Sequence, residues 1–87
     1  MVTVVIPTPF RKFSDGRDRV EVEGATLRQV FDNLGKVYPE LKEQVVSGDG
    51  LRPGLAVAIN DLYTDEGLLE KVPDGCTIHI LPALSGG

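Results

Sequence analysis

The residues that could take part in chemistry are few: one histidine, one cysteine and a glycine carboxylate where the sequence ends. His79 lies in an apolar stretch with no acid or nucleophile near it in the sequence, which is typical of a structural or exposed histidine rather than a catalytic one. Cys76 is in phase with Ile78 and Ile80, so we expect a buried thiol with a raised pKa and little reactivity. The sequence therefore predicts no catalytic constellation, and the protein is not expected to be an enzyme.

The final segment LPALSGG carries the most distinctive chemical group of the chain. Residues 83–87 extend over at most roughly 17 Å at about 3.4 Å per residue, enough to leave a domain surface and enter another protein's pocket. Gly86 and Gly87 lack a Cβ, so they could pass a narrow channel and align the carboxylate for attack on a nucleotide phosphate. Adenylation by ATP would turn a carboxylate oxygen into a leaving group, and sulfur or an amine could then displace AMP. Gly87 is thus the predicted reactive site.

Composition limits the classes of protein to which the chain could belong. Its 87 residues, 41% of them hydrophobic and 25% charged, predict one soluble globular domain. The net charge of −4 disfavours nucleic acid as a partner. One cysteine excludes an internal disulfide framework and a cysteine-rich zinc site, and neither a signal peptide nor a membrane span is recognisable, so we expect a cytoplasmic chain without a metal. We also expect it to be a monomer when free.

The first half of the chain reads as two strands followed by a helix. The β-branched run Val2–Pro7 and the alternating segment Arg19–Glu23 predict a hairpin with a long polar loop, in which the basic stretch FRKF favours a solvated loop over a recognition patch. Thr26 and Gln29 have the spacing of a capping box. The apolar stripe that follows predicts an amphipathic helix ended by Pro39 and formed by Leu27, Val30, Phe31, Leu34 and Tyr38.

The second half predicts a short helix and two more strands. PELKEQVVSG favours a helix with Leu41 and Val45 facing inward, and GDGLRPG reads as a loop. LAVAIN reads as a strand, Asn60 and Asp61 as a turn, and CTIHILP as the last strand. Between them Leu68, Leu69 and Val72 are expected to cover an edge of the sheet.

These elements predict an α+β fold in which a curved sheet grips one main helix. If the strands are neighbours, the sheet face opposite the core is unusually small and apolar, which indicates a docking surface beside the end of the chain. That face would consist of Thr3, Val5, Ala56, Ala58, Thr77, His79 and Leu81. The alternative is that a loop such as GDGLRPG covers it.

From VTVVIP through TLRQVFDNL and AINDL to DGCTIHILPALSGG, the chain resembles the ubiquitin-like β-grasp sulfur carriers of the ThiS and MoaD type. The resemblance implies a β-grasp domain over residues 1–82, with a mixed sheet on one main helix, and a flexible Gly-Gly tail over residues 83–87. It implies that an E1-like enzyme consumes ATP to adenylate Gly87 and that the product is a thiocarboxylate, with no cofactor bound by the chain itself. The residues expected to contact partners are Val5, Ala56, Ala58, His79, Leu81, Pro82, Ala83, Leu84, Ser85 and Gly86.

Within this family, IPTPFRKF and LPALSGG look most similar to the carrier of an alternative cysteine synthesis. That similarity implies a cysteine synthase-like acceptor of the sulfur and a metalloprotease that releases the product. The molybdopterin synthase small subunit shares the Ser-Gly-Gly type of ending, so a large molybdopterin synthase subunit is the alternative acceptor. A protein modifier joined to lysines and a simple interaction module also remain open, as does whether Gly-Gly is encoded or exposed by proteolysis.

Overall fold

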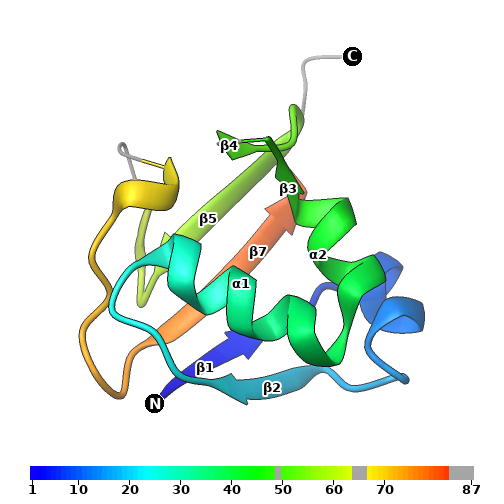
Figure 1. Cartoon of the computed structure of the whole chain (residues 1–87), viewed down its shortest axis with the longest axis horizontal. Helices are drawn as coiled ribbons and strands as arrows, with labels where there is room; N and C mark the ends of the chain where they lie inside the picture. The colour runs from blue at the N-terminus through cyan, green and yellow to red at the C-terminus, as the bar shows by residue number, and fades with distance from the viewer. Residues whose placement is uncertain (49, 64–66, 83–87) are drawn as a thin grey trace.

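A computed structural model of the chain describes residues 1–48, 50–63 and 67–82. One five-stranded sheet carries both α-helices on the same face, and the strand order is β2-β1-β7-β5-β6 (Figure 1). The elements are β1 (Val2–Val5), η1 (Thr8–Phe13, a 3-10 helix), β2 (Arg19–Val22), α1 (Leu27–Val37), α2 (Pro39–Val45), β3 (Val46–Ser47), β4 (Gly50–Leu51), β5 (Leu55–Ile59), β6 (Leu62–Tyr63), η2 (Gly67–Leu69, also 3-10) and β7 (Thr77–Pro82). The predicted α+β architecture is confirmed. The predicted tail, residues 83–87, lies outside the described residues.

The central strand β7 joins two hairpins. β1 and β2 pair antiparallel with Val2 opposite Val22, and β5 and β6 pair antiparallel with Ile59 opposite Leu62. β7 runs parallel to β1 and antiparallel to β5, so the sheet is mixed. The predicted hairpin at the start of the chain is therefore confirmed as β1 and β2. The last two predicted strands, β5 and β7, are also confirmed, and they are neighbours in the sheet.

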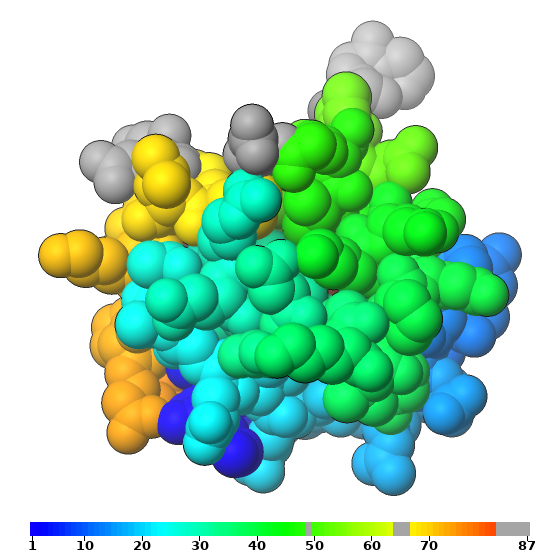
Figure 2. Space-filling view, in the orientation of Figure 1, coloured from blue at the N-terminus to red at the C-terminus, as the bar shows by residue number. Residues whose placement is uncertain are grey.

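The core lies between the sheet and α1. The four apolar residues of the predicted stripe that fall within α1 are fully buried: Leu27, Val30, Phe31 and Leu34. They meet every second residue of the strands, including Val4, Val57 and Ile78. Burial of each such side chain is worth about 1.5–3 kcal/mol before conformational entropy is counted, so these α1 residues contribute substantially to the stability of the core. Figure 2 shows how the side chains of α1 and α2 cover this face of the sheet.

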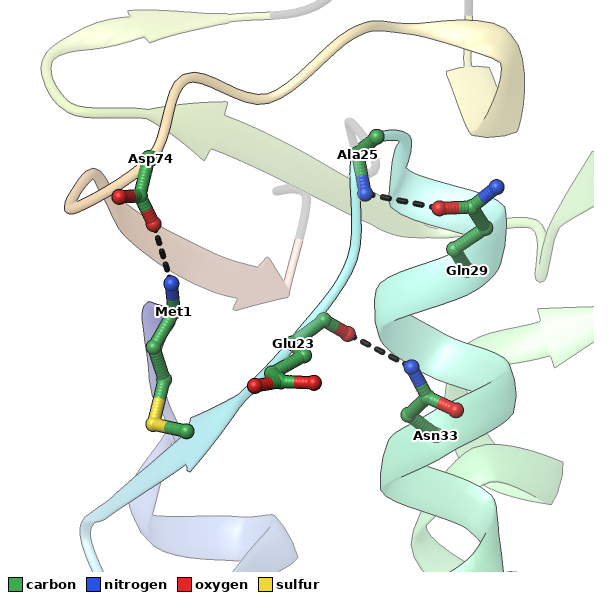
Figure 3. Close-up of polar contacts among 6 residues, drawn as sticks. All are labelled: Met1, Glu23, Ala25, Gln29, Asn33 and Asp74. Atoms are coloured by element: carbon green, nitrogen blue, oxygen red, sulfur yellow. Dashed lines mark hydrogen bonds and ion pairs between the residues drawn. The ribbon is translucent and has the colours of Figure 1, made fainter.

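Side-chain hydrogen bonds hold the start of α1, and Figure 3 shows those made by Gln29 and Asn33. The Thr26 hydroxyl accepts from the Gln29 amide at 3.3 Å. The Gln29 side chain reaches back and accepts from the Ala25 amide at 2.8 Å, one residue before the cap. One turn further on, the Asn33 side-chain amide donates to the Glu23 carbonyl at 2.7 Å, which ties the middle of α1 to the segment that enters it.

The segment predicted to be a solvated loop after β1 is instead largely a 3-10 helix. In this helix three residues complete a turn, so Phe10 and Phe13 lie on one side and both pack against the core. Their ring centroids are 6.4 Å apart, and the Lys12 ammonium lies 5.2 Å from the centre of the Phe13 ring. Of the two basic residues between them, Lys12 is exposed, whereas Arg11 is half-buried and donates from Nε to the Ile6 carbonyl at 3.1 Å.

The short strands β3, β4 and β6 were not predicted. β3 and β4 form a small two-stranded sheet in the region expected to be a helix end and a loop. Of the three residues predicted to cover an edge of the sheet, Leu68 and Val72 are buried, whereas Leu69 is 76% exposed. A 3-10 turn of three residues presents one side to the core, and Leu68 occupies that side.

Candidate docking face and carrier terminus

The outer face of the sheet, the face opposite the helices, contains one continuous row of side chains that crosses all five strands. Strand register places Arg19 opposite Val5, Val5 opposite His79, His79 opposite Ala58, and Ala58 opposite Tyr63. A second row contains Leu81 opposite Ala56. The structure thus brings together Val5, Ala56, Ala58, His79 and Leu81, the described outer-face members of the predicted partner-contacting set.

The helices leave this face uncovered, and so does the described part of the glycine-proline segment. Leu51 packs against the core cluster on the helical side. The Arg52 amide donates to the Val45 carbonyl at 2.8 Å, and the Arg52 guanidinium donates to the Glu43 carbonyl at 2.8 Å. The described residues of GDGLRPG are therefore anchored to α2, so the alternative that this segment covers the outer face is wrong for them.

β7 contributes residues to the outer face, and its last residue is also the last described residue of the chain. Pro82 is the last residue of β7 and lies opposite Leu55, the first residue of β5. Leu81, one residue earlier, is part of the outer face. The predicted contact residues Ala83, Leu84, Ser85 and Gly86 and the predicted reactive residue Gly87 follow directly and lie outside the described residues. The structure therefore places the root of the terminal segment at one margin of the outer face.

Ala58 lies at the bottom of the predicted contact surface. It is only 6% exposed although it lies on the outer face, because its methyl group lies between the longer side chains of His79 and Tyr63. Its small size instead creates a shallow hollow of about 220 Å³. The hollow is lined by Ala58, Asn60, Asp61, Tyr63, His79 and Leu81.

Tyr63 is the outer-face residue that the sequence analysis missed. It is 68% exposed and forms one wall of the hollow. The signal was present in the chain: a two-residue turn at Asn60 and Asp61 after an alternating strand predicts a hairpin, which would bring Tyr63 back opposite Ala58.

Asn60 fixes the position of this hairpin. Its backbone adopts the left-handed conformation with φ of 56°, which asparagine tolerates better than most residues. Its amide donates to the Thr77 carbonyl at 2.7 Å, and its side-chain oxygen accepts from the Thr77 amide at 3.1 Å. The turn is therefore bound to β7, which fixes the position of Tyr63 relative to His79.

The remaining candidate residue, Cys76, lies on the opposite side of the sheet. It is 4% exposed and belongs to the core cluster. Burial raises the pKa of its thiol, as expected for a cysteine that fills space among aliphatic side chains. The expected structural role of Cys76 is confirmed.

Within residues 1–48, 50–63 and 67–82, no three His, Cys, Asp or Glu side chains are placed so that they could hold a metal ion. No helix in the same ranges is long and apolar enough to cross a membrane.

Comparison with known proteins agrees with this geometry. The sulfur carrier protein CysO of Mycobacterium tuberculosis is 32% identical over 99% of this chain and 98% of its own length. A chain of the crystal structure of the Amycolatopsis orientalis BexX/CysO complex superposes with a TM-score of 0.92 at 36% identity, over 100% of both chains. The small archaeal modifier protein 1 of Methanosarcina acetivorans superposes with a TM-score of 0.79 at 28% identity, over 99% of this chain and 95% of its own.

The family model for ThiS matches residues 4–87, from the second half of β1 through all later strands of the mixed sheet and the segment that follows them. The fold is the ubiquitin-like β-grasp, as the resemblance implied. This chain belongs to the ThiS family.

Proposed function

We propose that this chain is a sulfur carrier for cysteine biosynthesis and that its Gly87 carboxylate is the group that carries the sulfur. In the first step the carboxylate attacks the α-phosphate of ATP on an E1-like enzyme, forming the acyl adenylate and releasing pyrophosphate. In the second step a sulfur nucleophile displaces AMP, and a C-terminal thiocarboxylate results. The chain supplies the carboxylate and the recognition surface, whereas the activating enzyme supplies the catalytic groups and consumes the ATP.

The observation that carries this proposal is the agreement along the whole chain with a protein named as a sulfur carrier. The order of features supports it: a rigid strand, β7, leads from the outer face directly to the segment that ends in Gly87. The recognition surface and the carboxylate would thus be joined by a short segment, so that binding of the surface brings the carboxylate within reach of the nucleotide.

The proposed contact surface is the outer face together with the terminal segment. Tyr63, His79 and Leu81 supply aromatic, polar and aliphatic groups around the hollow, and Val5 continues the surface across β1. Residues 82–86 would lie in the channel that leads to the partner's active site, with Gly86 at its narrowest part. The second partner is a cysteine synthase-like enzyme on which the thiocarboxylate meets an activated serine derivative, and a metalloprotease would then release the product.

The test is intact-protein mass spectrometry after incubation with an activating enzyme, ATP and a sulfur donor. We expect the mass gain that corresponds to replacement of one oxygen by sulfur, located on Gly87 by fragmentation. A chain that lacks Gly86 and Gly87 is the matched control and should gain no mass. Absence of the gain from the full chain, with an enzyme active on another carrier, would contradict the proposal.

The similarity to the small archaeal modifier protein supports a second candidate, in which the activated Gly87 is joined to lysines of other proteins. Both functions share the adenylation step, and they differ only in the nucleophile that displaces AMP. Branched Gly-Gly remnants on lysines in digested cell extract would favour the modifier. A lysine proteome free of such remnants, together with a detected thiocarboxylate, would favour the carrier alone.

A further inference from the structure

β2 is an edge strand of the sheet, and its open side has a definite pattern of backbone groups. Along β1, backbone groups point alternately to its two neighbours. The Thr3 amide donates to the Cys76 carbonyl on the β7 side, whereas the Ile6 amide, just after β1, donates to the Asp18 carbonyl on the β2 side. Because hydrogen bonds alternate along an antiparallel pair, Val20 and Val22 direct their backbone groups toward β1. The backbone groups of Arg19 and Glu21 therefore point outward, along the margin at the bottom of Figure 1.

The charges on this edge are self-complementary. Arg19 and Glu21 flank Val20, and both side chains are exposed on the outer face of the sheet. Within the described residues neither side chain takes part in a hydrogen bond or ion pair. A second β2 strand placed antiparallel about Val20 would put Arg19 opposite Glu21 on both sides of the symmetry axis. Each Arg19–Glu21 pair would bring opposite charges together across the two strands. The backbone groups of these residues point away from β1, so each pair would also form the backbone hydrogen bonds between the two copies.

An exposed apolar residue lies beside the same point of the strand. Val37, at the end of α1, is 66% exposed and lines a groove with Val20 and Leu34 between α1 and β2. The groove has a volume of about 270 Å³. In an antiparallel pair centred on Val20, the helices of both copies lie on the same side of the joined sheet. The two Val37 side chains would then approach each other across the axis and bury surface that one copy exposes.

We propose that two copies of this chain form a symmetric dimer by pairing their β2 edges about Val20, with Arg19 of each copy opposite Glu21 of the other. An unpaired edge is a template for a further strand, and here the charge order fits a second copy of the same edge. The short strand and the net charge of −4 predict a weak, concentration-dependent dimer. This inference replaces the monomer expected from the sequence and does not depend on the proposed carrier function.

The experiment is sedimentation equilibrium of the full chain over a wide concentration range at low salt, with charge-reversed variants. Arg19→Glu and Glu21→Arg each turn both symmetric pairs into like-charge pairs, so each should weaken dimerisation by about tenfold or more. The double variant R19E/E21R restores two opposite-charge pairs and should dimerise like the original chain. An equimolar mixture of the two single variants should form a heterodimer that neither forms alone.

Two further variants separate this interface from general effects of charge. Asp61→Arg changes the net charge by the same amount as Glu21→Arg but lies at the turn before β6, the opposite edge of the sheet, and should leave the dimer unchanged. Val37→Asp places two carboxylates near the symmetry axis and should weaken dimerisation. A chain that stays monomeric at every concentration overturns the proposal, and so does a dimer that is insensitive to Arg19→Glu or is not restored in the double variant.

Discussion

Gly24 is a residue whose missing side chain is a packing requirement. A Cβ at this position would lie 2.7 Å from both the side-chain Cγ2 and the backbone nitrogen of Val30. Since that nitrogen belongs to the first turn of α1, it cannot move without the helix. We expect Gly24→Ala to lower the free energy of unfolding by about 1–3 kcal/mol in urea denaturation. Gly50→Ala is the control, because no atom lies within 4 Å of its added Cβ, and it should change stability by less than about 0.5 kcal/mol.

A second prediction at this scale concerns the ion pair between the Met1 ammonium and the Asp74 carboxylate (Figure 3). The hydrogen bond with Asp74 raises the pKa of the ammonium, and the same contact lowers the pKa of the carboxyl group. A lowered acid pKa gives stability that is lost as pH falls through the folded-state pKa of Asp74. A raised amine pKa gives stability that is lost as pH rises through the folded-state pKa of Met1.

The stability difference between the original chain and Asp74→Asn should therefore be greatest between these two pKa values and shrink at both extremes. Denaturation midpoints across the pH range measure it. Both groups are exposed, so the difference should also shrink in high salt. A difference that stays constant with pH would show that Asp74 acts on stability by some route other than this ion pair.

At the scale of elements, β6 provides a matched pair of substitutions for the docking face. Tyr63 and Leu62 are neighbours with similar exposure, 68% and 76%, but successive side chains of a strand point to opposite faces. Tyr63→Ala removes an aromatic wall of the hollow, so it should raise the KM of the activating enzyme for the carrier by about five- to thirtyfold. Leu62→Ala should leave that KM unchanged. Equal effects of both substitutions would mean that the activating enzyme does not bind specifically to the outer face.

The long elements could be predicted from the sequence because their patterns repeat. The stripe from Leu27 to Leu34 covers two turns, and the alternation in β5 and β7 assigned Val57 and Ile78 to the core before any pairing was known. The sequence also assigned His79 and Leu81 to the opposite face. Elements of two or three residues show no such repeat, which is why β3, β4, β6 and the exposure of Leu69 were not predicted.

The candidate site was predicted less completely than the fold, for a different reason. Its strand residues follow from alternation, but exposure on a sheet face depends on neighbours that only the register supplies. Ala58 is buried because Tyr63 and His79 are its cross-strand partners, and neither pairing is visible in the local sequence. Phe10 and Phe13 were missed because three-residue spacing in a proline-bounded segment also occurs in loops.

At the scale of the whole molecule, the proposed docking hollow and the proposed dimer edge lie on different parts of one sheet. The hollow lies over β5, β6 and β7, whereas β2 is the edge strand at the far margin and is separated from β5 by two strands, β1 and β7. An antiparallel pair about an axis perpendicular to the sheet leaves both outer faces on the same side of the joined sheet. The proposed dimer would thus keep both docking hollows accessible to an activating enzyme.

The central position of β7 also has a consequence for the order in which the protein is made. Among the described strands, the β1–β2 and β5–β6 hairpins do not pair with each other, and β7 joins them into one sheet. On the ribosome this joining strand is synthesised after both hairpins, so neither half can complete the sheet while the chain still ends before Thr77. A nascent chain interrupted before that residue cannot close the fold. The strand that leads to Gly87, the proposed reactive residue, is thus also the strand that completes the sheet, so a chain long enough to present that residue is also long enough to fold.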